Sequence, residues 1–176
     1  FLHALKEKGF DNILGIEQNE NLIKQARQFL PENAVVQSNE HLSNSLQEAD
    51  VIVAFFVLEH VQKAHLFWEN LNNVKKGTYF IFSVPAYGLS TLLESAFPSY
   101  AARNLDNALH TQLYTDASID YALKKAGFKR LNTWYFGQEA VDLVRLVSHQ
   151  VSSIYDEDMQ KRVLDSLKTM IDPLQS

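Results

Sequence analysis

A glutamate and a histidine directly follow the most apolar run of this sequence. Residues 50–56 read DVIVAFF, and Leu58, Glu59 and His60 come just after it. An imidazole can act as an acid or a base in an enzyme, because its charge changes close to neutral pH. Two plainer readings compete: the helix dipole favours an acid such as Glu59 in a first helical turn, and His60 is equally at home as a solvated surface residue. Both residues are therefore candidates for the lip of a binding crevice, and His60 is a candidate base.

A second acid closes an earlier apolar run. Residues 12–17 read NILGIE, which predicts a short strand ending at Glu17. A carboxylate in that place can accept hydrogen bonds from both hydroxyl groups of a nucleotide's ribose. Acids at strand ends are also common without such a role. Glu17 is accordingly either a ribose ligand or an ordinary surface acid.

The elements that position these residues alternate between helix and strand. Apolar residues recur at helical spacing in some segments and form short continuous runs in others. Helices are predicted at 1–8, 19–31, 59–76, 115–127, 138–151 and 156–171, and strands at 12–17, 34–38, 50–56, 78–86 and 128–137. Parallel strands need crossover connections, so this order predicts a doubly wound α/β fold with a mainly parallel sheet. In such folds ligands bind beyond the carboxyl ends of the strands, where Glu17 and Glu59 lie.

Composition narrows the class of protein. The chain has 176 residues, 46% of them hydrophobic, with a net charge of -5 and no cysteine. The absence of cysteine excludes disulfides and cysteine-ligated zinc, and no metal site is expected. Lysine and arginine are scattered, which argues against a nucleic-acid partner, and no apolar run reaches the roughly 20 residues of a membrane helix. We expect a cytoplasmic protein that acts on a small molecule and has no membrane partner.

Three stretches together resemble class I S-adenosylmethionine-dependent methyltransferases, and in particular small-molecule and glycan O-methyltransferases. They are GIEQNENLIKQA at 15–26, EADVIVAFFVLEHV at 48–61 and HTQLYTDASIDYALKKAGF at 110–128. The resemblance implies a Rossmann-like fold, S-adenosyl-L-methionine as cofactor and methyl transfer to an oxygen of a small-molecule or sugar-linked acceptor. It also implies that Glu17 holds the ribose, that Asn39 or Glu40 neighbours the adenine, and that Phe55 and Phe56 flank the methionyl end. Packing in the core is the alternative role for the two phenylalanines.

The chain departs from this family's pattern at its start. The family begins with a strand and a glycine-rich turn, whose backbone approaches the cofactor closely because glycine has no Cβ. This sequence opens instead in the helix predicted at 1–8. We therefore expect an N-terminally truncated piece of a longer protein, or a strand supplied by another chain, and weak cofactor binding by the chain as written.

A long stretch between predicted elements, about 87–114, is the candidate lid or acceptor-binding insertion. It holds Arg103, His110 and Tyr114. In the family that the chain resembles, insertions at this point cover the acceptor, which makes Arg103 and Tyr114 candidate substrate ligands. His110 joins His60 as a candidate catalytic base, and the sequence does not choose between them.

The expected domain organisation is a partial methyltransferase domain at 1–137 followed by a helical extension at 138–176. The two C-terminal helices carry wide apolar stripes, which predict packing on the sheet or on each other, with a homodimer interface as an alternative. Two other function classes stay open. One is a non-catalytic methyltransferase-like binding module, and the other is a nicotinamide-dependent oxidoreductase, which shares the ribose-binding acid.

Overall fold

The computed structural model describes residues 1–37, 42–98, 110–137, 139–154 and 156–171. Its chain packing divides into two compact units, one made of Phe1–Ile52 and Leu66–Phe80 and the other of Val53–His65 and Ile81–Ser176. Each unit is described by itself below. Among the described residues, no helix has the length and apolar character needed to cross a membrane.

The first unit begins with a helix and a pair of short parallel strands. β1 and β2 pair in parallel, with Glu17 opposite Gln37 at their carboxyl ends. The side-chain oxygen of Asn19 caps the helix after β1 by accepting the main-chain N–H groups of Asn21 and Leu22. In chain order the elements are α1 (Leu2–Glu7), β1 (Gly15–Glu17), α2 (Glu20–Ala26), a 3₁₀ turn (Glu32–Ala34), β2 (Val35–Gln37), α3 (Leu42–Gln47) and later α4 (Ala64–Leu71), which starts in the other unit.

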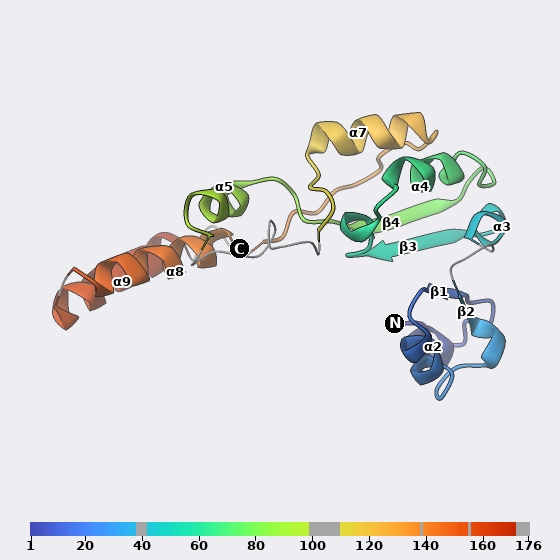
Figure 1. Cartoon of the computed structure of the whole chain (residues 1–176), viewed down its shortest axis with the longest axis horizontal. Coiled ribbons are helices and arrows are strands. Elements are labelled where there is room, and N and C mark those ends of the chain that lie inside the picture. The colour runs from blue at the N-terminus through green and yellow to red at the C-terminus, as the bar shows by residue number, and fades with distance from the viewer. Residues whose placement is uncertain (38–41, 99–109, 138, 155, 172–176) are drawn as a thin grey trace. The chain divides into compact units, whose positions relative to one another are not determined.

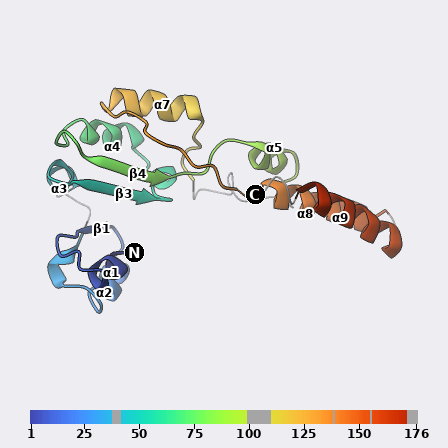
Figure 2. The same ribbon diagram turned by 180° about the vertical axis from the view of Figure 1, so that it is seen from behind.

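The remaining two strands also run parallel. β3 (Val51–Phe55) pairs with β4 (Tyr79–Ser83). At the start of the pair the N–H of Tyr79 donates to the carbonyl of Asp50 (2.9 Å), and at its end the N–H of Phe56 donates to the carbonyl of Ser83 (3.0 Å). The two strands therefore begin at the same end of the pair and run in the same direction. Their arrows point the same way in Figure 1 and, from behind, in Figure 2.

The described residues form only small sheets. Their strands make two separate two-stranded sheets, β1–β2 and β3–β4. The prediction of parallel strands is confirmed. That the two pairs belong to one doubly wound sheet, from which an N-terminal strand is missing, stays a prediction.

The helix predicted at 59–76 is also different in the structure. Residues Leu58–His60 form a 3₁₀ turn, Val61 is extended, and α4 begins only at Ala64. The main-chain carbonyls of residues 58, 59 and 61 accept hydrogen bonds from residues 111–114. A continuous α-helix would need those carbonyls for its own ladder, so the contact with residues 111–114 replaces the first helical turns.

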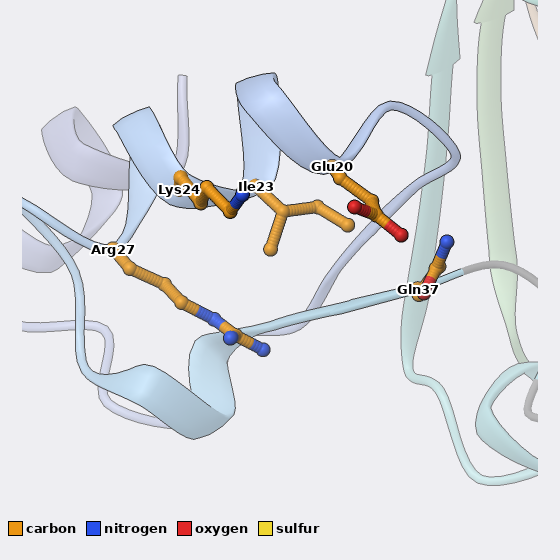
Figure 3. Close-up of a pocket in the computed structure, with 5 residues that line it drawn as sticks. All are labelled: Glu20, Ile23, Lys24, Arg27 and Gln37. Carbon is orange, nitrogen blue, oxygen red and sulfur yellow. The ribbon is translucent and has the colours of Figure 1, made fainter.

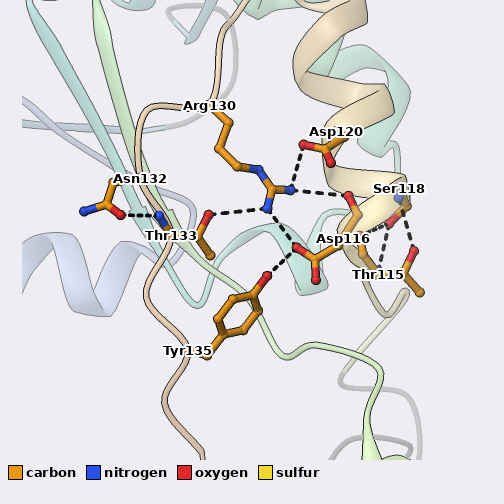
Figure 4. Close-up of polar contacts among 8 residues, drawn as sticks. All are labelled: Thr115, Asp116, Ser118, Asp120, Arg130, Asn132, Thr133 and Tyr135. Atoms are coloured by element: carbon orange, nitrogen blue, oxygen red, sulfur yellow. Dashed lines mark hydrogen bonds and ion pairs between the residues drawn. The ribbon is translucent and has the colours of Figure 1, made fainter.

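The strand predicted at 128–137 is absent. This segment is irregular, and the side chains of Lys129 and of residues 131–137 are exposed. Arg130 fastens the segment to α7 (Asp116–Lys125) instead, through ion pairs of 2.8 Å to both Asp116 and Asp120 (Figure 4). The hydroxyl of Tyr135 donates to the same Asp116 carboxylate (2.7 Å). The segment is thus held by side chains and not by a strand ladder.

This anchor predicts a dependence of stability on pH. The hydrogen bonds from Arg130 and then Tyr135 lower the pKa of Asp116 below its ordinary 3.8. A carboxyl whose pKa is depressed by folding stabilises the protein above the unfolded-state pKa, and that contribution is lost as the pH falls through the folded-state pKa. We expect Asp116→Asn to lower the urea midpoint at pH 7 and the difference from the parent to shrink as the pH falls below the ordinary pKa of Asp116.

The control for this prediction is Asp158→Asn, which removes an exposed ion pair with Arg162 (2.9 Å) on α9. It should change the urea midpoint little at any pH, because exposed pairs are worth little. A difference between parent and Asp116→Asn that stayed constant from pH 7 to pH 3 would contradict the assignment.

Three helices of the second unit are linked by two helix–helix contacts. They are α5 (Leu89–Ala96), α8 (Glu139–Ser152) and α9 (Glu157–Ile171). α8 contacts both α5 and α9, and α8 and α9 lie side by side in both views (Figures 1 and 2). Between α5 and α8 the buried hydroxyl of Ser90 donates to the carboxylate of Asp142 (2.8 Å). The domain boundary at 137/138 stays a prediction.

Candidate functional site

The turn that follows β3 buries a carboxylate. Glu59 is only 1% exposed, as is its neighbour Leu58. Within the described part of the chain, Oε2 of Glu59 accepts no hydrogen bond. A buried polar atom without a partner costs about 1–3 kcal/mol, and more when the group is charged, so such an atom often marks a functional position.

Residues 111–114, named the clasp from here on, donate hydrogen bonds to the turn at residues 58–61. The N–H of Thr111 donates to the carbonyl of Glu59 (2.7 Å). The side-chain amide of Gln112 donates to the carbonyls of Leu58 (2.8 Å) and Val61 (3.2 Å). Two hydroxyl groups also donate hydrogen bonds to this turn. The hydroxyl of Thr111 donates to the carbonyls of Glu59 and Val61, and the hydroxyl of Tyr114 donates to the carbonyl of Leu58. Every one of these bonds ends on a main-chain carbonyl.

The clasp is itself attached to the segment after β4. Ala86 and Tyr114 form an isolated parallel bridge, and the N–H of Tyr87 donates to the carbonyl of Tyr114 (2.7 Å). Tyr114 is 5% exposed, and Thr115 after it caps α7 by accepting the N–H of Ser118. The clasp therefore lies between two fixed points, the bridge at Tyr114 and the turn at residues 58–61.

The clasp brings the two candidate bases together. One ligand atom each of Glu59, His60 and His110 lies within 4.8 Å of the others, and the two imidazole ring centres are 5.0 Å apart. His60 is exposed and His110 is half-buried above the buried Glu59. We call this group the Glu59–His60–His110 cluster. The sequence identified both histidines separately, but it gave Glu59 no committed role; the signal for it was the position directly after the apolar strand.

The cluster supports two kinds of chemistry. An imidazole beside a buried carboxylate can take a proton from a reacting hydroxyl group. Two imidazole nitrogens and one carboxylate oxygen are also a donor set for a divalent transition metal. No spacing motif in the sequence indicates this set, since the three residues come from two distant segments, and no metal site is predicted from the sequence.

Glu17, the predicted ribose ligand, lies at the carboxyl end of the β1–β2 pair. Glu17 is half-buried at the end of β1, and its Oε1 accepts the N–H groups of Gln18 (2.8 Å) and Asn19 (2.9 Å). Its register partner Gln37 ends β2. Asn39 and Glu40 themselves lie outside the described residues.

A pocket of about 190 Å³ lies beside this edge (Figure 3). It is lined by Glu20, Ile23, Lys24, Arg27 and Gln37. Arg27 is positioned there by donating to the carbonyl of Val35 (3.2 Å). The pocket is lined by both acidic and basic groups. Of its lining residues, Gln37 alone is also the register partner of Glu17 at the carboxyl end of the β1–β2 pair. It belongs to the first unit, whereas the Glu59–His60–His110 cluster belongs to the second.

The phenylalanines at the end of β3 are not core residues in this structure. Phe55 is 48% exposed and Phe56 is 54% exposed, while the alternate residues Ile52 and Ala54 are buried. Phe56 adopts a φ of 52°, which is unusual for a bulky residue and turns the chain out of the strand. Their predicted place at the methionyl end of the cofactor stays a prediction.

The two predicted substrate ligands have different outcomes. Arg103 lies outside the described residues. The hydroxyl of Tyr114 donates to the carbonyl of Leu58 (3.3 Å), so the structure gives Tyr114 a positioning role in the clasp. A contact of Tyr114 with an acceptor stays a prediction.

Comparison with known proteins identifies the family. The family model described as a methyltransferase domain matches residues 1–133. No curated protein and no solved structure matches the chain. The match covers well over half of the 176 residues and includes β1, β2, the β3 turn and the clasp. The chain therefore belongs to the methyltransferase domain family.

Proposed function

We propose that this chain contributes to an S-adenosylmethionine-dependent methyltransferase of class I that methylates an oxygen of a small-molecule or sugar-linked acceptor. The observation that carries the proposal is the Glu59–His60–His110 cluster at the carboxyl end of β3 in a chain of this family. Ligands of α/β proteins bind at that end of the strands. The cluster is the place where the acceptor oxygen loses its proton.

The reaction asks two things of the chain. S-adenosylmethionine would supply the methyl group, and its carbon–sulfur bond breaks as the acceptor oxygen bonds to the methyl carbon, leaving S-adenosylhomocysteine. The chain must hold the acceptor in line with that bond, since orientation contributes much of such a rate. It must also receive the hydroxyl proton, and an imidazole of the cluster is suited to that step.

Glu17 is the proposed ribose ligand. Both main-chain bonds that fix its carboxylate end on Oε1. A carboxylate oxygen can accept more than one hydrogen bond, so the group keeps acceptor capacity for ribose hydroxyls while its orientation is set by the turn. Asn39 or Glu40, which follow β2, are the proposed neighbours of the adenine.

Titration of S-adenosylhomocysteine tests the proposal. The calorimetric experiment uses two forms of the protein: this chain, and the chain with the residues encoded upstream of it in the gene. Each form is measured with Glu17 intact, as Glu17→Ala and as Glu17→Gln. Saturable binding by either parent form is expected, with the affinity lowered at least tenfold by Glu17→Ala, because a hydrogen bond to a charged group contributes about 1.5–3 kcal/mol. Glu32→Ala, which removes an exposed acid of the same unit, should leave the affinity unchanged.

Two outcomes decide against the proposal. Absence of binding by both parent forms, with circular dichroism showing both folded, would overturn it. Binding without any methyl transfer to hydroxylated acceptors would favour the non-catalytic module. We also propose a cytoplasmic location and a homodimer that forms through the C-terminal helices.

A further inference from the structure

The unpartnered oxygen of Glu59 is the starting observation. Oε2 of this 1% exposed side chain has no hydrogen-bond partner among the described residues. A buried carboxylate is normally paired with a cation or with several donors, because leaving water costs it several kcal/mol. A positive ligand bound at this oxygen would remove that cost.

The neighbouring groups supply the rest of a metal site. The ligand atoms of Glu59, His60 and His110 lie within 4.8 Å of one another. In a tetrahedral zinc site with bonds of about 2.0–2.1 Å, ligand atoms are roughly 3.3 Å apart. The difference is within the reach of side-chain rotation, so the main chain does not have to move.

The main chain already brings the two histidines together. Thr111 and Glu59 share a main-chain hydrogen bond of 2.7 Å, and His110 and His60 are their immediate neighbours in sequence. The clasp therefore sets the spacing of the imidazoles through backbone contacts that do not involve the imidazoles. Such a site is preorganised, which reduces the entropy that binding would cost.

We propose that the Glu59–His60–His110 cluster binds one divalent transition-metal ion of the Zn²⁺ type. Two imidazole nitrogens and one carboxylate favour Zn²⁺ and its neighbours over Mg²⁺ and Ca²⁺, which prefer oxygen ligands. Three protein ligands leave one position of a tetrahedral ion open, and the exposure of His60 puts that position within reach of solvent.

The proposal deepens the function of the same site. Its catalytic meaning rests on the proposed function, whereas metal binding itself does not. A hydroxyl group bound at the open position would lose its proton more readily, because a divalent cation lowers the pKa of an oxygen bound to it. In that case the histidines act as ligands, and the acceptor oxygen is both placed and ionised at the metal.

Titration of ZnCl₂ into the chain tests the inference, with Co²⁺ absorption spectra as an independent measure of nitrogen coordination. One site per chain is expected. His60→Gln and His110→Gln should each weaken it at least tenfold, and Glu59→Gln should do the same while keeping the side chain's shape. His65→Gln removes an exposed histidine of α4 outside the cluster and should change nothing. MgCl₂ should bind much more weakly than ZnCl₂.

The outcomes separate the two proposals. Unchanged Zn²⁺ affinity in His60→Gln and in Glu59→Gln would show scattered binding to surface histidines and overturn the metal site. His60→Gln alters an exposed side chain, so it remains a fair test even if Glu59→Gln unfolds. S-adenosylhomocysteine binding without a Zn²⁺ site would remove this inference alone, and a Zn²⁺ site without S-adenosylhomocysteine binding would remove the proposed function alone.

Discussion

Replacing Leu71 by alanine is expected to lower the free energy of unfolding by about 2–5 kcal/mol. Leu71 is 0% exposed at the end of α4, and Trp68 of the same helix is 9% exposed. Trp68 and Phe80 meet edge to face with ring centres 6.0 Å apart. Truncating Leu71 removes buried methyl groups and leaves a cavity in a closely packed interior.

Urea unfolding followed by tryptophan fluorescence measures this loss, because Trp68 reports on the packing of α4. The matched control is Leu66→Ala on the same helix, where the side chain is 44% exposed. This change should cost less than about 1 kcal/mol, since surface substitutions rarely cost more. Equal losses for the two variants would mean that Leu71 does not carry the packing of this helix.

Removing both imidazoles of the Glu59–His60–His110 cluster is expected to have a large effect on activity. The double variant His60→Gln, His110→Gln is expected to slow methyl transfer by about 10²–10⁴-fold, the usual contribution of positioned acid–base groups. Both histidines are replaced together because their ring centres lie 5.0 Å apart, so that one imidazole could substitute for the other. S-adenosylhomocysteine affinity should stay within a factor of about three, which corresponds to less than 1 kcal/mol.

The measurement is formation of S-adenosylhomocysteine from S-adenosylmethionine with a panel of phenols, catechols and glycosides. His65→Gln serves as the control, since it removes an exposed imidazole outside the cluster. A double variant that keeps the parental kcat on an accepted substrate would show that the proton leaves elsewhere. The cluster would then lose its proposed part in the reaction.

The sequence predicts local elements well where their signal is local. The run at 50–56 becomes β3, the short run ending at Glu17 becomes β1, and Thr115 caps α7 as its residue type suggests. These features depend on apolar runs and capping side chains, which neighbours along the chain determine.

The errors of the sequence-based prediction arise where contacts between residues far apart in the sequence determine the local structure. The helix predicted from Glu59 fails because Thr111, 52 positions later, donates to its carbonyl. Residues 128–137 have the aromatic content of a strand, but strand propensity has effect only when a partner strand is present. Arg130 and its two aspartate partners hold the segment instead.

The same distance explains what the sequence revealed of the site. Each histidine was recognisable as a candidate by its residue type and by the element beside it. Their proximity was not, because it comes from a contact between segments far apart in the chain. The burial of Glu59, whose Oε2 has no hydrogen-bond partner within the described ranges of the chain, also depends on tertiary packing, which no local pattern encodes.

The clasp has a consequence for how this domain can evolve. Its hydrogen bonds to residues 58–61 all end on main-chain carbonyls. Every amino acid carries such a carbonyl, so mutations that change the side chains at 59 and 60 leave the supporting bonds available. Descendant proteins can therefore exchange the reactive groups of this turn, gaining or losing a chemistry, while they inherit the same framework.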